Sequence, residues 1–544
     1  MKRKLISTAL VLIMLLSTLT SCSLFHQNAE ETEDELKTVY PTVKTSEMEF
    51  TLSEEDVEKF QKKLKTCQEL YDSNLQENAA ELEKQLYKLN SLLMKIEVQE
   101  GIAYLQYCYN LSDPEAKENY EYAIATANQA NSDFWSLQPD EDSPENVLDA
   151  TVRAFLEKEY AHARMEKGAA VPYGEKLDAL TIQFNAYNGE GTPEEIYDLY
   201  VEYWDTAKKY AQRYGYDNYY DCVSKVRYMR DYGKKEREEF RSYVKAYLIP
   251  LFKKLKNKSE QADAILTPAQ YQKSIAYSKD RYDSFSENYL FSYFESLPES
   301  GGKAMMEAFE KDRIFIGDQP NSRFLAFTTM VGDTPICYFN ANEMNMTTVS
   351  HEIGHYYCST VNQYEDSLTM DLKEIHSQAN SLLLYSYLQK QLDDPAFDSF
   401  CAYEVYNMVY QTISCTIRDE FDEKVFGAGS KKYTVPELNQ IMAELLREYG
   451  VADLSDNMVQ QLTTYWHRLG LSHPGYEISY AVSLVASLQI YQKSLTDYDG
   501  AAESYCRLVE NLNMEQSFTD KLADAGLYSP FERSTYTELK KLGE

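Results

Sequence analysis

The chain has 544 residues, of which 44% are hydrophobic and 13% aromatic, so most of it can fold around substantial cores. Acidic residues (87) outnumber Lys and Arg (54), which gives a formal net charge of -33 at pH 7. A surface this acidic repels a polyanion and argues against nucleic acid as a partner. Glycine is sparse (20) and tyrosine abundant (47), which favours helices with aromatic faces over a turn-rich β protein.

Residues 1–21 are typical of a signal peptide. Lys2, Arg3 and Lys4 precede an apolar run, Leu5 to Leu19, that is too short to favour a membrane-spanning helix. The run ends in Leu-Thr-Ser-Cys22, which resembles the lipobox of bacterial lipoproteins. The resemblance implies cleavage before Cys22 and a lipid on its sulfur; an ordinary secretory signal is the alternative. Residues 22–49 would then be the lipidated cysteine and an acidic tether, which anchors the protein outside the cytoplasm on the cell membrane.

The sequence pattern of residues 50–296 predicts an N-terminal region of helices joined by short loops. Leu82, Leu86, Leu89, Leu93 and Ile96 form one apolar stripe at helical spacing. Helix starts are marked where a capping side chain precedes a proline, namely at Asp113-Pro114, Ser143-Pro144, Thr192-Pro193 and Thr267-Pro268. Eight cysteines follow Cys22 without any CxxC pair, so buried thiols are at least as well supported as disulfides.

The pattern changes after residue 297, where a second region extends to residue 544. LPESGG (297–302) indicates a break, and the runs RIFIG, RFLAFTTMV and TPICYFN predict short strands. Helical periodicity returns after residue 346. We therefore expect a mainly α fold with two lobes and a small sheet directly before the helix at 347–360.

That helix carries the motif His351-Glu352-Ile-Gly-His355. Histidines at i and i+4 project from one face of a helix and can bind one metal ion through their imidazole nitrogens. Glu352 can act as the base that takes a proton from water as the water attacks a carbonyl. The alternative is a structural pair of histidines.

Downstream, Glu374 opens the sequence E-x-x-S-x-x-N, with Ser377 and Asn380 at the other two positions. The two motifs together resemble the M3 metallopeptidases, the group of thimet oligopeptidase and oligoendopeptidase F. TPICYFNAN before the first motif and SHPGYEISYAVSLVASLQIY near the C-terminus are also similar to family segments, so the likeness extends from about residue 324 to the end.

The resemblance implies a helical peptidase with one zinc ion, held by His351, His355 and Glu374. It implies that Tyr476 and Tyr480 donate hydrogen bonds to the carbonyl oxygen as it becomes an oxyanion. His473 is a further candidate for binding the substrate or the oxyanion, with a local loop contact as its alternative.

The chain also departs from the family pattern. Cys358 and Ser381 stand where the family often has a histidine and an acid, and Ser483 stands where a tyrosine is expected. The connection from His351 to Glu374 is short, so the nearby acids Glu365, Asp366 and Asp371 are rivals for the third ligand position. Cys358 as a ligand and His376 as a functional group are weaker alternatives to structural roles.

The function that these motifs imply is a membrane-tethered zinc endopeptidase that hydrolyses oligopeptides. A related carboxypeptidase or dipeptidase would need a cation for the terminal carboxylate, and Arg313, Arg418 and Arg468 are available. A lipoprotein that binds peptides without cutting them is the alternative outside enzymes, but a binding protein has no need of Glu352.

Overall fold

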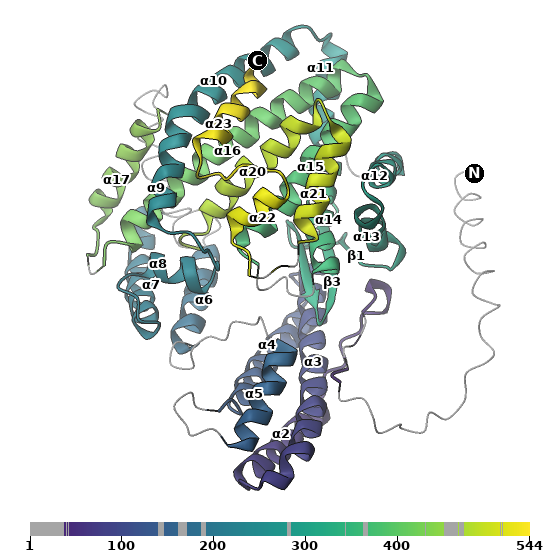
Figure 1. The fold of residues 1–544 in the computed structure, drawn as a ribbon, viewed down its shortest axis with the longest axis vertical. Helices are drawn as coiled ribbons and strands as arrows, with labels where there is room; N and C mark the ends of the chain where they lie inside the picture. Colours follow the sequence, from purple (N-terminus) through teal and green to yellow (C-terminus); the bar gives the residue numbers. More distant parts are fainter. Residues whose placement is uncertain are drawn as a thin grey trace, which may run out of the picture.

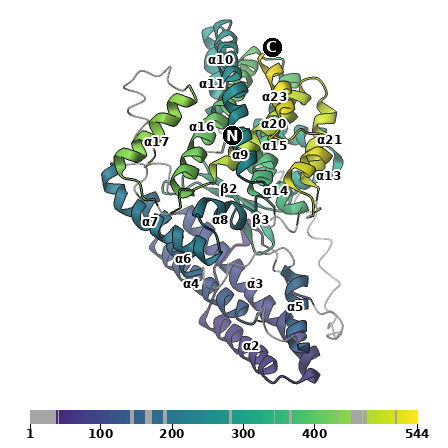
Figure 2. The same ribbon diagram turned by 60° about the vertical axis from the view of Figure 1, so that its left-hand side comes forward.

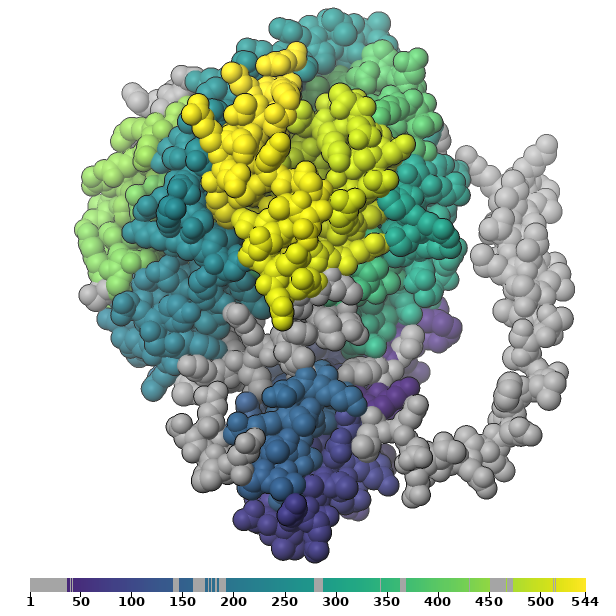
Figure 3. Space-filling view, in the orientation of Figure 1, coloured from purple at the N-terminus to yellow at the C-terminus, as the bar shows by residue number. Residues whose placement is uncertain are grey.

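The computed structural model describes residues 37–544, apart from 40, 42, 140–145, 161–170, 187–191, 280–283, 343, 363–367, 430, 451–465, 467–472, 512 and 514. The described part consists of helices and one three-stranded sheet. A smaller N-terminal lobe projects from a larger helical body (Figures 1 and 3). The predicted fold class, mainly α with a small sheet, is confirmed.

The smaller lobe is built by four long helices with a core of their own. They are α2 (Glu54–Asp72), α3 (Ala79–Tyr109), α4 (Pro114–Trp135) and α5 (Val147–Tyr160), with the short turns η1 (Thr45–Glu47) and η2 (Gln76–Asn78). The predicted stripe from Leu82 to Ile96 lies on α3 and is buried in this core. Burial of such a stripe, rather than helix propensity alone, stabilises the long α3 helix.

The larger body surrounds a second core that runs from Leu177 to Leu542 and therefore crosses residue 297. Its helices before the sheet are α6 (Val171–Ala186), α7 (Pro193–Arg213), α8 (Tyr219–Val226), α9 (Lys234–Tyr243), the π-helical turn η3 (Val244–Leu248), α10 (Ile249–Ala264), α11 (Pro268–Lys279), α12 (Ser284–Ser296) and α13 (Glu299–Glu310). After the sheet come α14 (Met346–Val361), α15 (Met370–Leu392), α16 (Pro395–Phe426), α17 (Val435–Glu448), α20 (Glu477–Ser494), α21 (Tyr498–Val509), α22 (Phe518–Asp524), α23 (Arg533–Leu539) and η6 (Lys540–Gly543).

Three of the four predicted helix starts are confirmed at Pro114, Pro193 and Pro268, and the fourth lies outside the described residues. The break predicted over 297–302 is shorter than expected, because α13 begins at Glu299 and includes both glycines. A Cβ on Gly302 would lie 2.2 Å from the Phe294 carbonyl oxygen, so this glycine permits a close helix approach rather than a turn.

The sheet lies between the two lobes (Figure 2). Its strands β1 (Ile314–Gly317), β2 (Ala326–Val331) and β3 (Thr334–Asn340) are ordered β1-β3-β2, with β1 parallel and β2 antiparallel to β3. One face packs on α3 through Val331, Ile336 and Tyr338, and α14 lies against β2 and β3. The sheet before the motif helix was predicted, and it joins the small lobe to the helix that carries the histidines.

Part of the segment expected to be a tether lies against this sheet. Val43 is buried with the sheet residues, and the Thr45 backbone N–H donates to the Asp312 carbonyl oxygen at 3.0 Å.

Cys22 and the predicted signal peptide lie outside the described residues. Within the described residues, none of the helices has the length and apolar character needed to cross a bilayer. The eight cysteines from Cys67 to Cys506 are buried and form no disulfide.

Candidate active site

Helix α14 presents the two histidines of the motif. Asn345 caps the helix, because its side chain accepts a hydrogen bond from the Thr348 backbone N–H at 2.9 Å. His351 and His355 follow four residues apart, with their ring centroids separated by 5.1 Å. The helix therefore places both imidazoles on one side, as the spacing predicts.

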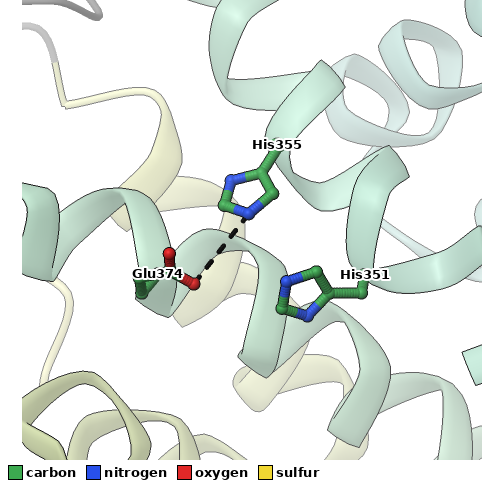
Figure 4. Close-up of side chains that lie close together, drawn as sticks. All are labelled: His351, His355 and Glu374. Atoms are coloured by element: carbon green, nitrogen blue, oxygen red, sulfur yellow. Dashed lines mark ion pairs between the residues drawn. The ribbon is translucent and has the colours of Figure 1, made fainter. Parts of the chain in front are cut away.

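Helix α15 brings Glu374 to the same point (Figure 4). The His355 Nε2 and Glu374 Oε2 atoms are 3.9 Å apart. One ligand atom from each of His351, His355 and Glu374 lies within 4.8 Å of the others. The three residues predicted as metal ligands thus converge, although Glu374 comes from a different helix.

The two helices approach closely because small and polar residues line their interface. A Cβ on Gly354 would lie 2.6 Å from the His376 carbonyl oxygen and 2.7 Å from the Ser377 Cα atom. Asn380 Nδ2 donates to the Ser350 carbonyl oxygen at 2.6 Å, and the Ser350 and Ser381 hydroxyl oxygens are 3.0 Å apart. The glycine of HEIGH and the asparagine of the second motif therefore hold the backbones at the separation that the histidines and Glu374 require.

Glu352 is buried on the side of α14 that faces strand β2. Its Oε2 atom is 2.9 Å from the Thr328 hydroxyl, and its carbonyl oxygen is 3.0 Å from the same group. The Cys337 thiol, directly opposite Thr328 in the sheet register, also approaches the Glu352 carbonyl oxygen, at 3.8 Å. The single hydrogen of the Thr328 hydroxyl is therefore within reach of both the carboxylate and the carbonyl oxygen of Glu352.

Tyr476 and Tyr480, at the start of α20, lie at the same centre. The Tyr476 hydroxyl donates to Glu374 Oε1 at 2.9 Å, and the two tyrosine hydroxyl oxygens are 3.3 Å apart. Gly475, with φ of 78°, supports the turn that precedes α20, and Asp422 accepts its N–H at 2.9 Å. His473 is exposed, and its ring centroid lies 6.1 Å from that of Tyr476. The structure thus brings together the tyrosine pair and the metal-ligand candidates, with His473 at the edge.

Burial is the largest influence on the pKa values of the histidines and glutamates of this site. It lowers the pKa of His351 to about 4 and, together with the neighbouring His351, lowers that of His355 well below its usual value. Burial raises the pKa of Glu374 to about 7, against hydrogen bonds from Tyr476 and Ser377 that lower it. It likewise raises the pKa of Glu352 to about 8, although the Thr328 hydroxyl lowers it.

The donor set fits zinc. Two imidazoles that remain neutral keep a nitrogen lone pair for a metal, and two histidines with one glutamate are a ligand set of catalytic zinc sites. A cation near Glu374 would offset the cost of ionising a carboxyl that is only 4% exposed. Ser377 lies 3.5 Å from Glu374 Oε2 and Tyr476 bonds its other oxygen, so both carboxylate oxygens are oriented.

The rival residues lie elsewhere or have other partners. Asp371 pairs with Arg230 at 3.3 Å, and Cys358 is buried in the large core. Arg418 pairs with Glu477 at 2.7 Å, and Arg313 is buried before strand β1. Glu365, Asp366 and Arg468 lie outside the described residues. Arg313 and Arg418, the two candidate cations among the described residues, therefore give no specific support to a carboxylate-binding pocket.

Thr328 is a site residue that motif reasoning missed. It lies in the predicted strand RFLAFTTMV, but the strand pattern does not show which threonine faces α14. Only the pairing of Thr328 with Cys337 and the packing of β2 on α14 place it beside Glu352. Its signal was a polar side chain in the second of three predicted strands that precede the motif helix.

Comparisons with known proteins identify the fold. No protein-family model matches the chain, and no curated protein sequence matches it. Among solved structures, one assigned as an oligoendopeptidase F has a TM-score of 0.68 at 15% identity, covering 92% of this chain and 97% of that one. PZ peptidase A, solved with an inhibitor, gives 0.64 at 16% identity, covering 92% and 98%. Oligoendopeptidase F from Enterococcus faecium gives 0.54 at 13% identity, covering 90% and 98%. The resemblance inferred from the motifs is confirmed at the level of the fold, over nearly the whole chain.

Proposed function

We propose that this protein is a zinc-dependent endopeptidase that hydrolyses oligopeptides. The observation that carries the proposal is the convergence of His351, His355 and Glu374 within 4.8 Å, on a fold shared with peptidases. Glu352 on the same helix and the Tyr476 hydroxyl 2.9 Å from Glu374 supply the other groups that amide hydrolysis requires.

In this proposal His351, His355 and Glu374 hold one zinc ion. Zinc supplies Lewis-acid chemistry, since it polarises a carbonyl and makes water a better nucleophile at neutral pH. Glu352, whose carboxylate the charge of a bound zinc ion would help to keep ionised, takes a proton from the attacking water and delivers it to the departing amine. Thr328 keeps that carboxylate oriented.

Tyr476 and Tyr480 have a separate task. Their hydroxyls donate hydrogen bonds to the carbonyl oxygen of the substrate as negative charge develops on it. The Tyr476 hydroxyl has a single hydrogen, which it donates to Glu374 in this structure. It therefore redirects that hydrogen when a substrate is bound.

A purified full-length chain tests the proposal with an internally quenched peptide library, with bound zinc measured in parallel. We expect about one zinc per chain and cleavage at internal peptide bonds. Glu352→Gln should retain zinc and lose cleavage by about three orders of magnitude or more, because the general base is removed. Glu374→Ala should lose zinc. Intact peptides at full zinc occupancy would instead refute the peptidase and favour a peptide-binding protein, and release of C-terminal residues alone would show a carboxypeptidase.

We also propose that the protein is tethered to the outer side of a bacterial cell membrane through a lipid on Cys22. The basic, apolar and Leu-Thr-Ser-Cys segments at the N-terminus support this proposal. Cys22→Ser should abolish labelling by a radioactive fatty acid in the bacterial host and shift the protein from the membrane fraction to the soluble fraction. Labelling that persists in Cys22→Ser would rule out this attachment site.

A further inference from the structure

The segment Tyr228–Tyr232, between α8 and α9, lies buried beside the candidate site although it carries none of the site's motifs. The Arg230 side chain is 0% exposed, and Tyr228 is also buried. A buried guanidinium is costly to desolvate, and a buried ion pair contributes little net stability. Arg230 is therefore better explained by the geometry that it imposes than by the stability that it adds.

One side of the segment holds the start of α15. Arg230 Nε lies 3.3 Å from Asp371 Oδ1, and Asp371 precedes Glu374 by three residues on the same helix. The Met370 backbone N–H also donates to the Tyr228 carbonyl oxygen, at 3.4 Å. Both contacts fix the first turn of the helix from which Glu374 projects.

The other side holds the start of α20. Arg230 Nη2 donates to the Ser479 hydroxyl at 2.7 Å, and Ser479 directly precedes Tyr480. The Tyr228 hydroxyl donates to the Pro474 carbonyl oxygen at 3.3 Å, and its ring centroid is 5.8 Å from that of Tyr476. One guanidinium therefore connects the helix of the third ligand to the helix of the two tyrosines.

The segment is itself firmly held. Lys225 Nζ donates to the Arg230 carbonyl oxygen at 2.8 Å, and the Phe518 backbone N–H donates to Asp231 Oδ2 at 2.6 Å. Met229 has φ of 52°, a left-handed conformation that a non-glycine residue keeps only where its surroundings impose it. A segment fixed at both ends can transmit position to what it contacts.

We propose that the Tyr228–Tyr232 segment is a positioning element, and Arg230 its positioning residue, that fixes Glu374 and the Tyr476/Tyr480 pair relative to each other. The two groups meet at the bond between the Tyr476 hydroxyl and Glu374 Oε1, 2.9 Å long. A shift of either helix would change the direction of both the metal ligand and the oxyanion donors. The catalytic part of this inference rests on the proposed peptidase function.

The first test removes single hydrogen bonds from the segment in the full-length zinc protein. Tyr228→Phe deletes the hydroxyl that bonds Pro474, and Ser479→Ala deletes one partner of Arg230. We expect kcat on a quenched peptide to fall about three- to tenfold, with KM changed less than about twofold. Tyr536→Phe is the matched control, because its buried hydroxyl donates to the Pro530 carbonyl oxygen at 2.7 Å, away from the site. Ser494→Ala is the second control, a buried serine on the same helix α20.

The second test does not depend on activity. Arg230→Lys keeps the charge but cannot reach Asp371 and Ser479 together, so we expect zinc affinity, measured by chelator competition, to fall about tenfold. Arg237→Lys is the control, since this buried arginine pairs with Asp221 and Glu423 instead. Wild-type zinc affinity in Arg230→Lys, or control-level kcat in both Tyr228→Phe and Ser479→Ala, would overturn the inference. A wild-type chain that cuts no peptide would refute the proposed function, and the zinc measurement would still decide the role of the segment.

Discussion

Thr328 shows how a residue outside both motifs orients the candidate base. Its hydroxyl lies 2.9 Å from Glu352 Oε2, on the edge strand β2. Thr328→Val keeps the shape of the side chain but removes this hydrogen bond, so Glu352 would sample unproductive orientations. We expect kcat to fall about tenfold with zinc content unchanged, as measured by peptide cleavage and metal analysis.

Two companion variants separate this role from a general effect on the strand. Thr328→Ser retains a hydroxyl and should recover most of the lost kcat. Thr329→Val changes the neighbouring position, whose side chain alternates to the other face of β2, and should leave kcat near the wild-type value. Full activity in Thr328→Val would show that Glu352 needs no such support.

At the scale of single residues, the sequence predicts those site residues whose positions depend only on their spacing along one helix. His351, Glu352 and His355 follow from a period of 3.6 residues, and Glu374 follows from resemblance to the second motif. Thr328 and Arg230 could not be predicted in this way, because their contacts with Glu352 and Asp371 depend on strand packing and on a loop far away in the chain.

At the scale of elements, the close pairing of α14 and α15 determines the metal-ligand geometry. A Cβ on Gly354 would meet backbone atoms of His376 and Ser377, at 2.6 and 2.7 Å, and backbone cannot move aside as a flexible side chain can. Gly354→Ala should therefore push the helices apart. We expect the free energy of unfolding to fall by about 2 kcal/mol and zinc affinity to weaken, as measured by urea denaturation and chelator competition.

Gly233→Ala provides the contrasting substitution. Its added Cβ would have only Glu236 Oε2 nearby, at 3.6 Å, so we expect a change within about 0.5 kcal/mol. If Gly354→Ala bound zinc as tightly as the wild type, the separation of α14 and α15 would not control the ligand set.

The same contrast explains why the glycines at 301 and 302 were wrongly taken to predict a break. A glycine in the sequence can indicate either a turn or a close approach of two backbones, and only the tertiary contacts distinguish the two.

At the scale of the whole molecule, the boundary between the two cores along the chain does not coincide with the change in sequence pattern at residue 297. Local sequence patterns indicate where a series of helices is followed by strands. They do not record that α9 pairs with α16, about 180 residues later, through Arg237 and Arg241 on one side and Asp419 and Glu423 on the other. The large core therefore includes helices from both predicted regions.

This ion-pair network makes stability depend on pH in a definite direction. Burial would raise the pKa of Glu423, but the guanidinium groups of Arg241 and Arg237 outweigh it and hold the pKa below its ordinary value of 4.5. The fold thus favours the ionised carboxyl, and its contribution to stability is complete above the ordinary pKa and lost as pH falls through the lowered folded pKa. Glu423→Gln should lower the free energy of unfolding by roughly 2–4 kcal/mol at neutral pH.

The variant and the wild type should converge in acid. Urea denaturation at neutral pH and at a series of pH values below 4.5 measures the difference, which should shrink as the pH falls through the lowered pKa of folded Glu423. Glu310→Gln removes the same charge from an exposed position on α13 and should have little effect at any of these pH values. A Glu423→Gln deficit that stayed constant across this range would mean that Glu423 contributes through packing, and that the charges on α9 do not hold α16 in place.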